Sequence, residues 1–186
     1  MATTRENKTI SQFKSQLIGG GARPNLFEVE LTTLPAGIAW PADNFRYMCK
    51  AAQLPASVIA NIDIPFRGRI FKVAGDRTIE PWSITVINDE DFRIRKAMEE
   101  WVDRIAKLEN NLGATDPSAY MVNAKVFQLG RGATPSSSTN VGDRNAVLRE
   151  YEFIDIFPTS VSSIDLSYDS SDTIEEFVVD FAVQSF

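Results

Sequence analysis

The sequence predicts a mainly β protein, an antiparallel β-sandwich or barrel with one amphipathic α-helix on its flank. Two observations predict the sheet: apolar and polar residues alternate in many short segments, and residues typical of turns separate these segments. A third predicts the helix, because one segment, at about residues 89–111, carries apolar residues at helical spacing. With 186 residues, the chain can bury a stable core without disulfides or metal.

The first 21 residues are expected to form an N-terminal arm that ends in a glycine hinge, ahead of a single β-domain at residues 22–186. Three consecutive glycines at 19–21 supply the hinge. A frayed terminus explains this segment equally well. The apolar residues that suggest a short amphipathic or irregular arm are Ile10, Phe13, Leu17 and Ile18.

Strict alternation begins after the hinge. Phe27, Val29 and Leu31 face one side of the first expected strand. Glu28 and Glu30 face the other side, so that face is expected to be exposed to solvent. Many short strands of this kind favour an antiparallel sandwich or barrel. The expected strands are 25–31, 45–50, 58–64, 69–73, 82–87, 121–129, 147–157, 163–168 and 175–183.

The segment at about 89–111 is predicted to be a helix that lies on the sheet. Asn88 or Asp89 can cap its start, and Gly113 stands just beyond its end. The apolar stripe that must cover the sheet consists of Ile94, Met98, Trp101, Ile105 and Leu108.

Two extended loops are expected, at about 65–78 and at 130–145. The second is rich in small and polar residues and cannot build a core. The first concentrates four basic residues against one Asp76, a net charge of +3 in a protein of net charge −6. These charges fit either a partner surface or an ordinary solvated loop. The basic residues are Arg67, Arg69, Lys72 and Arg77.

The composition argues against catalysis. The chain has no histidine, which removes the usual general base and most metal ligand sets. Its single cysteine, Cys49, excludes an intrachain disulfide and is expected to fill the core. Asp169 and Asp172 fit a polar turn better than a calcium loop. We therefore expect no enzyme, no cofactor, no metal and, because no apolar run is long enough, no membrane insertion.

Four blocks of sequence are more specific than these patterns, and they stand in the same order as in a known family. The chain resembles the major tail tube protein of contractile-tailed, T4-like myovirus bacteriophages. The blocks span most of the chain from Ala22 onward: "ARPNLFEVEL", "CKAAQLPAS", "VAGDRTIEPWSITVINDED" and "FPTSVSSIDLSYDSSDTIEEFVVDFAV".

The resemblance implies a tail-tube β-domain whose hexameric rings stack into a hollow tube inside a contractile sheath. It implies a virion protein, assembled in the bacterial host's cytoplasm, that conducts the genome to the host without binding DNA specifically. The implied partners are copies of itself, the sheath protein, the baseplate hub or tube initiator, the tape-measure protein and the tail terminator. The alternatives are the inner tube of an extracellular contractile injection system that carries protein effectors and, less favoured, a monomeric enzyme or ligand-binding module.

The resemblance also implies two sets of functional residues. The loop at 65–78 would reach a neighbouring ring, and outward acids would line the lumen and repel phosphates. The contact candidates between rings or subunits are Phe66, Arg67, Arg69, Ile70, Phe71, Lys72, Asp76 and Arg77. The candidate lumen acids are Glu28, Glu30, Glu150, Glu152, Asp165 and Asp180.

Overall fold

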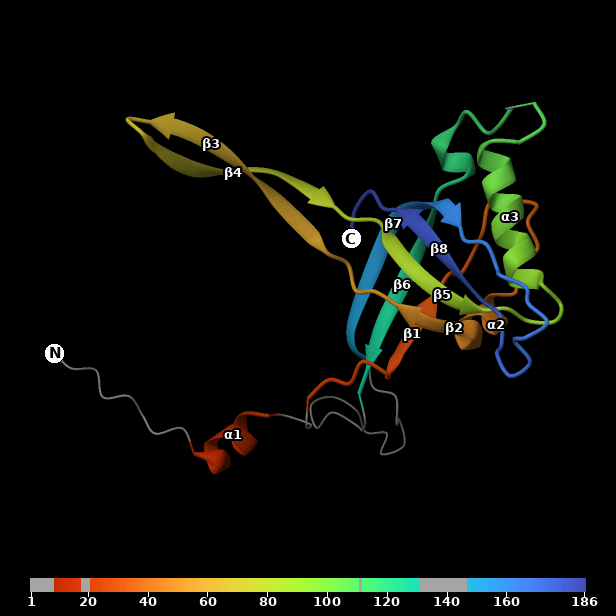
Figure 1. The fold of residues 1–186 in the computed structure, drawn as a ribbon, viewed down its shortest axis with the longest axis horizontal. Coiled ribbons are helices and arrows are strands. Elements are labelled where there is room, and N and C mark those ends of the chain that lie inside the picture. Colours follow the sequence, from red (N-terminus) through yellow and green to blue (C-terminus); the bar gives the residue numbers. More distant parts are fainter. Residues whose placement is uncertain (1–8, 18–20, 111, 131–146) are drawn as a thin grey trace. The chain divides into compact units, whose positions relative to one another are not determined.

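A computed structural model describes residues 9–17, 21–110, 112–130 and 147–186 (Figure 1). The chain forms two compact units, Met1–Glu28 with Phe127–Glu150 and Val29–Val126 with Tyr151–Phe186. The expected boundary after residue 21 stays a prediction. The elements are α1 (Ile10–Gln16), β1 (Phe27–Glu30), α2 (Ala42–Met48), β2 (Cys49–Ala52), β3 (Ser57–Phe66), β4 (Arg69–Ile79), β5 (Trp82–Ile87), α3 (Arg93–Ile105), a 3₁₀ helix η2 (Pro117–Ala119), β6 (Val122–Leu129), β7 (Val147–Val161) and β8 (Glu176–Ala182).

The predicted fold class is confirmed, since the chain is mainly β with antiparallel sheets and helices. Six strands form one sheet in the order β1-β6-β7-β8-β5-β2, and β3 pairs with β4 in a separate two-stranded sheet. The pairs β2–β5, β5–β8 and β7–β8 are antiparallel. The helix α2 was not expected, whereas α1 lies in the segment that was expected to form the N-terminal arm.

The strands β5 and β8 carry the centre of the core. Along both strands every second side chain is buried, as the pleat of a sheet with one covered face requires. The indole ring of Trp82 also stacks on Phe153 of β7 at a centroid distance of 4.4 Å. The buried pairs, directly opposed across the two strands, are Trp82 with Phe181, Ile84 with Val179 and Val86 with Phe177.

Helix α3 covers this buried face. Ile94, Met98 and Trp101, the first three residues of the expected stripe, are buried. The ring of Trp101 lies 5.8 Å from that of Phe181, and its indole N–H donates to the carbonyl oxygen of Tyr120 at 2.7 Å. The one polar atom of this buried tryptophan is therefore satisfied.

The helix is shorter than predicted, and its two ends explain why. Phe92 adopts the left-handed conformation (φ 53°), so the helix begins after it and neither Asn88 nor Asp89 caps it. At the other end Ala106 is extended, and the chain folds back. Ile105 is half-buried and Leu108 is 96% exposed, so the stripe does not continue to Leu108.

Two predicted strands are wrong. Residues 45–50 form the end of α2 and the start of β2, because the buried Phe45 and Cys49 are four residues apart and so share a helical face while Tyr47 is 84% exposed. Residues 163–168 form no strand: β7 ends at Val161, and the chain then leaves the sheet with Leu166 and Tyr168 exposed.

The helix α1 occupies the segment for which a short amphipathic or irregular arm and a frayed terminus were both considered. Thr9 caps it, because its hydroxyl accepts from the Gln12 N–H while the Gln12 side chain accepts from the Thr9 N–H. Its apolar side chains Ile10, Phe13 and Leu17 are exposed. Ile18, the first two hinge glycines and the loop at 131–145 lie outside the described residues.

Replacing Trp101 with aspartate tests the helix–sheet contact. The change removes a fully buried ring and places a carboxylate on the covered face. The free energy of unfolding, measured by urea titration, should fall by at least about 3 kcal/mol. The exposed Asp103 of the same helix is the matched control, and Asp103→Lys should change stability by less than about 0.5 kcal/mol. Equal stability of both variants would contradict the assignment of the core.

Candidate assembly surfaces

The two-stranded sheet of β3 and β4 is a long ribbon that projects away from the six-stranded sheet (Figure 1). Its turn consists of Arg67 and Gly68, which both have positive φ (46° and 79°), as two-residue hairpin turns of the left-handed type require. The expected loop at 65–78 is thus a regular hairpin. Paired backbone groups run from Ser57–Ile79 to Phe66–Arg69, interrupted by one bulge near Gly75.

One face of this hairpin is apolar and exposed. Opposed residues share a face, and one face carries the pairs Ile64–Phe71 and Ile62–Val73. The other face carries Asp63 opposite Lys72. We call the first face the apolar ribbon face; its large apolar side chains, between 38% and 66% exposed, are Ile62, Ile64, Phe66, Phe71 and Val73.

The four basic residues of the hairpin do not form one patch. Arg67 stands in the turn, with its guanidinium carbon 5.4 Å from the Phe66 ring centroid. Arg69 lies on the apolar ribbon face beside Phe66, whereas Lys72 lies on the opposite face. Arg77, near the base, stacks on a different aromatic ring, that of Phe186, at 5.2 Å. Only Phe66, Arg67 and Arg69 therefore gather at the tip.

The candidate lumen acids occupy different environments. Asp180 accepts hydrogen bonds from the hydroxyls of Ser83 and Ser160, on the sheet face opposite the buried pairs. Glu30 forms an ion pair with Arg46 at 2.8 Å. The remaining members are the exposed Glu150, Glu152 and Asp165 and the half-buried Glu28.

Sequence reasoning missed an acidic recess where β5 meets α3. Its volume is about 230 Å³. Asn88 is only 9% exposed there, and its amide donates to the Glu175 carboxylate at 2.9 Å. Its side-chain oxygen is buried without a hydrogen-bond partner among the described residues. The residues that line the acidic recess are Asn88, Asp89, Glu90, Phe92, Ile174 and Glu175.

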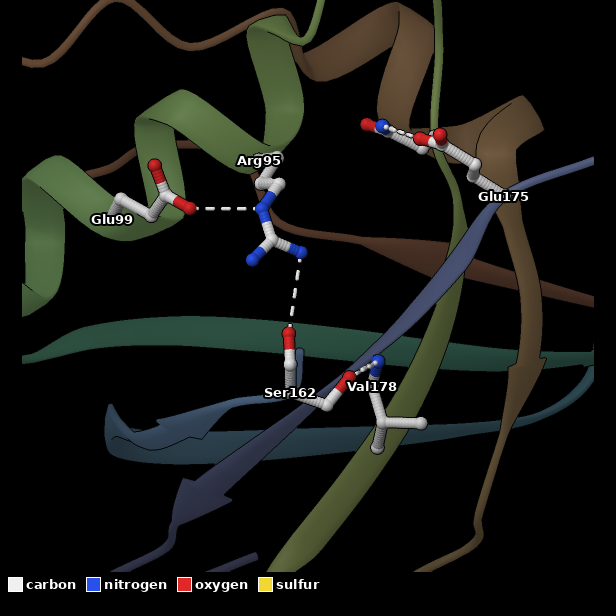
Figure 2. A network of polar contacts seen from close by, with 6 residues as sticks. Arg95, Glu99, Ser162, Glu175 and Val178 are labelled. Carbon is white, nitrogen blue, oxygen red and sulfur yellow. Dashed lines mark hydrogen bonds and ion pairs between the residues drawn. The ribbon is translucent and has the colours of Figure 1, made fainter. Parts of the chain in front are cut away.

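A polar network holds α3 to the strands next to this recess. Arg95 donates to Glu99 at 2.8 Å and to the carbonyl oxygen of Ser162 at 3.2 Å, and the Val178 N–H donates to the Ser162 hydroxyl (Figure 2). The Arg95 guanidinium also lies 5.4 Å from the Phe177 ring. These contacts fix the helix start relative to β7 and β8, and so fix the wall of the recess.

Cys49 has the properties of a core residue. It is buried, and that burial raises the pKa of its thiol to about 12, so the reactive thiolate is not formed near neutral pH. Among the described residues there is no group of three or more metal-binding side chains. That part of the chain also contains no helix with the length and apolar character needed to cross a membrane.

An antiparallel β-domain with an exposed apolar hairpin has the kind of surface by which a subunit contacts other chains, and comparisons with known proteins define its class. Residues 22–186 match the phage tail tube protein family. The chain is 34% identical over 165 residues to the tail tube protein gp19 of Enterobacteria phage T4. The aligned residues cover 89% of this chain and 90% of gp19. It is 23% identical over 175 residues to the tail tube protein of Serratia phage KSP90, with 92% of each covered.

Solved structures show the same fold. A chain of the anti-feeding prophage baseplate has a TM-score of 0.61 at 10% identity, with 89% of this chain and 93% of that chain covered. A chain of the anti-feeding prophage tube-terminating cap has a TM-score of 0.54 at 15% identity, with both chains fully covered.

The chain belongs to the phage tail tube protein family. It is a structural component of the virion tail and not an enzyme, as the sequence blocks predicted.

The raised pKa of Cys49 predicts a pH dependence of stability. Above pH 9.0, its ordinary pKa, the unfolded thiol loses its proton while the folded thiol keeps it up to about pH 12. The unfolded state then binds fewer protons, so stability should fall with rising pH by up to about 1.4 kcal/mol per unit. Urea titrations at pH 8 and pH 10.5 should show a steeper fall for the wild type than for Cys49→Ala. Equal slopes would contradict the shift.

Proposed function

We propose that six copies of the chain form a ring, and that rings stack head to tail into the hollow inner tube of a contractile tail. The exposed apolar ribbon face carries this proposal. An isolated two-stranded hairpin is marginally stable in water, and this one exposes five large apolar side chains along a single face. A surface of this kind needs a covering partner, and a second copy of the chain is the partner that a tube supplies.

Docking of the ribbon face has a substantial driving force. Full burial of one large apolar side chain contributes about 1.5–3 kcal/mol, so covering even part of this face outweighs the ordering of a few side chains. The contact is heterologous, because the hairpin of one copy lies on a different surface of the next. Contacts of this type close into rings or continue as open stacks, the two geometries of a tube.

We extend the proposal to the other components of the tail. The tube would start on a baseplate hub, enclose a tape-measure protein, end at a tail terminator and lie within the sheath. It would assemble in the cytoplasm of the bacterial host and conduct the genome. The sheet face opposite α3 is our candidate for the lumen, because Asp180 and the exposed Glu152 give it negative charge. Such a wall repels phosphates.

A double substitution on the ribbon face tests the proposal. Ile64→Asp with Phe71→Asp should leave the fold intact, with stability within about 1 kcal/mol of the wild type, because both side chains are largely exposed. Rings and tubes should disappear from negative-stain micrographs. The control is the opposed pair on the other face, Asn61→Asp with Ala74→Asp, which adds the same charge. Normal tubes from the first variant would contradict docking through this face.

Absence of specific DNA binding is a separate expectation. Wild-type tubes should not shift a duplex in a gel at physiological salt, because the chain is acidic overall. If tubes instead bound DNA tightly and released it steeply with added salt, the hairpin cations would be a nucleic-acid site, and a lumen that repels phosphates would be excluded.

A further inference from the structure

We propose that the acidic recess is the socket for the hairpin tip of a copy in the adjacent ring, with Arg67 as the inserted cation. The inference rests on the proposed stacking of rings and names the surface to which the tip docks.

The hairpin and the recess lie at different ends of the subunit. The hairpin strand β4 leads directly into the start of β5, and Asn88 of the recess follows directly after the end of β5. The hairpin base and the recess therefore stand at opposite ends of β5 (Figure 1). A strand of six residues is about 20 Å long. Stacking along the direction of β5 would bring the hairpin end of one copy to the recess end of the next.

The hairpin and the recess carry opposite charge. Segments 88–92 and 163–176, which supply the recess and its surroundings, contain eight acidic residues and no basic one. The hairpin, residues 57–79, contains four basic residues and two acidic ones. Two surfaces of opposite sign on the same molecule attract head to tail and repel like end to like end, which sets the direction of stacking.

The recess contains an unsatisfied hydrogen-bond acceptor. Buried polar atoms are nearly always hydrogen-bonded, yet the side-chain oxygen of Asn88 has no partner among the described residues. Carboxylates of Asp89, Glu90 and Glu175 line the same recess, and the Asn88 amide, the donor among these side chains, is already bonded to Glu175. An arginine guanidinium is the complement, because it carries five N–H donors and no acceptor.

The shape of the hairpin tip suits insertion into the recess. The turn places Arg67 at the far end of the hairpin, and a side chain at the neighbouring Gly68 would meet nothing within 4 Å. Phe66 accompanies the guanidinium at 5.4 Å. The recess provides matching apolar surface in Phe92 and Ile174, which are 47% and 72% exposed.

Charge reversal with rescue tests the pairing. Each purified variant would be assembled on its own, so that every interface joins two identical copies, and tube growth would be followed by light scattering and microscopy. Arg67→Glu alone and Glu90→Lys alone should each slow elongation at least about tenfold, because attraction becomes repulsion. The double variant should recover to within about threefold of the wild type, since the pair is restored with its signs exchanged.

A matched control separates pairing from net charge. Arg67→Glu combined with Asp103→Lys has the same total charge as the rescued variant but places the new lysine on the exposed face of α3, so it should not recover. Elongation of both single variants at the wild-type rate, or no recovery in the double variant, would overturn the socket. Wild-type protein that forms no rings or tubes at all would instead refute the proposed function.

Cross-linking provides a second readout that does not depend on charge. Arg67→Cys with Glu90→Cys should give ladders in tubes treated with a short bis-maleimide, because the two positions come close between copies but an arginine-to-glutamate span is too long for a disulfide; the native Cys49 is buried and does not compete. The same hairpin cysteine with Asp103→Cys should remain monomeric on a denaturing gel. Ladders only in this control, or in neither variant, would overturn the socket.

Discussion

The opposed buried pairs of β5 and β8, covered by α3, are the contact on which the rest of this molecule depends. Trp82, Phe181 and Trp101 meet there, so one short strand pair and one helix hold the sheet together. With the core fixed at this point, the chain can carry an eleven-residue strand, β4, that contributes almost nothing to the interior. The stability of the subunit and the docking of its hairpin are in this way assigned to different residues.

The sequence predicted the sheet well where a single periodicity applied. Residues 82–87 alternate strictly and form β5 with those bounds, because one covered face imposes a period of two. Residues 45–50 satisfied the strand and helix periods at once, since Phe45 and Cys49 repeat in both. In residues 163–168 apolar and polar side chains do alternate, but no strand among the described residues pairs with this segment. Local pattern cannot report whether a partner strand exists.

The assembly surfaces were only partly predictable. The residues of the hairpin are exposed, yet the period of the ribbon separates Arg69 from Lys72, which a linear charge count treats as one cluster. The acidic recess escaped notice because Asn88 and Glu175 are 87 residues apart in sequence. Neither segment, "INDED" at 87–91 or "TIEE" at 173–176, indicates a recess by itself. The buried side-chain oxygen of Asn88 is recognised only in the structure, where the two segments lie side by side.

The exposed apolar ribbon face has a consequence for the free subunit before any tube exists. The exposed apolar ribbon face favours premature polymerisation. A net charge of −6 opposes it, because subunits of like charge repel one another over roughly a Debye length, about 8 Å at physiological salt. Apolar docking acts only at contact, so the repulsion forms a kinetic barrier outside it. The same sequence therefore keeps free subunits apart and still allows rapid growth of a tube. Growth is rapid because the end of a tube already holds the surface to which the next hairpin docks.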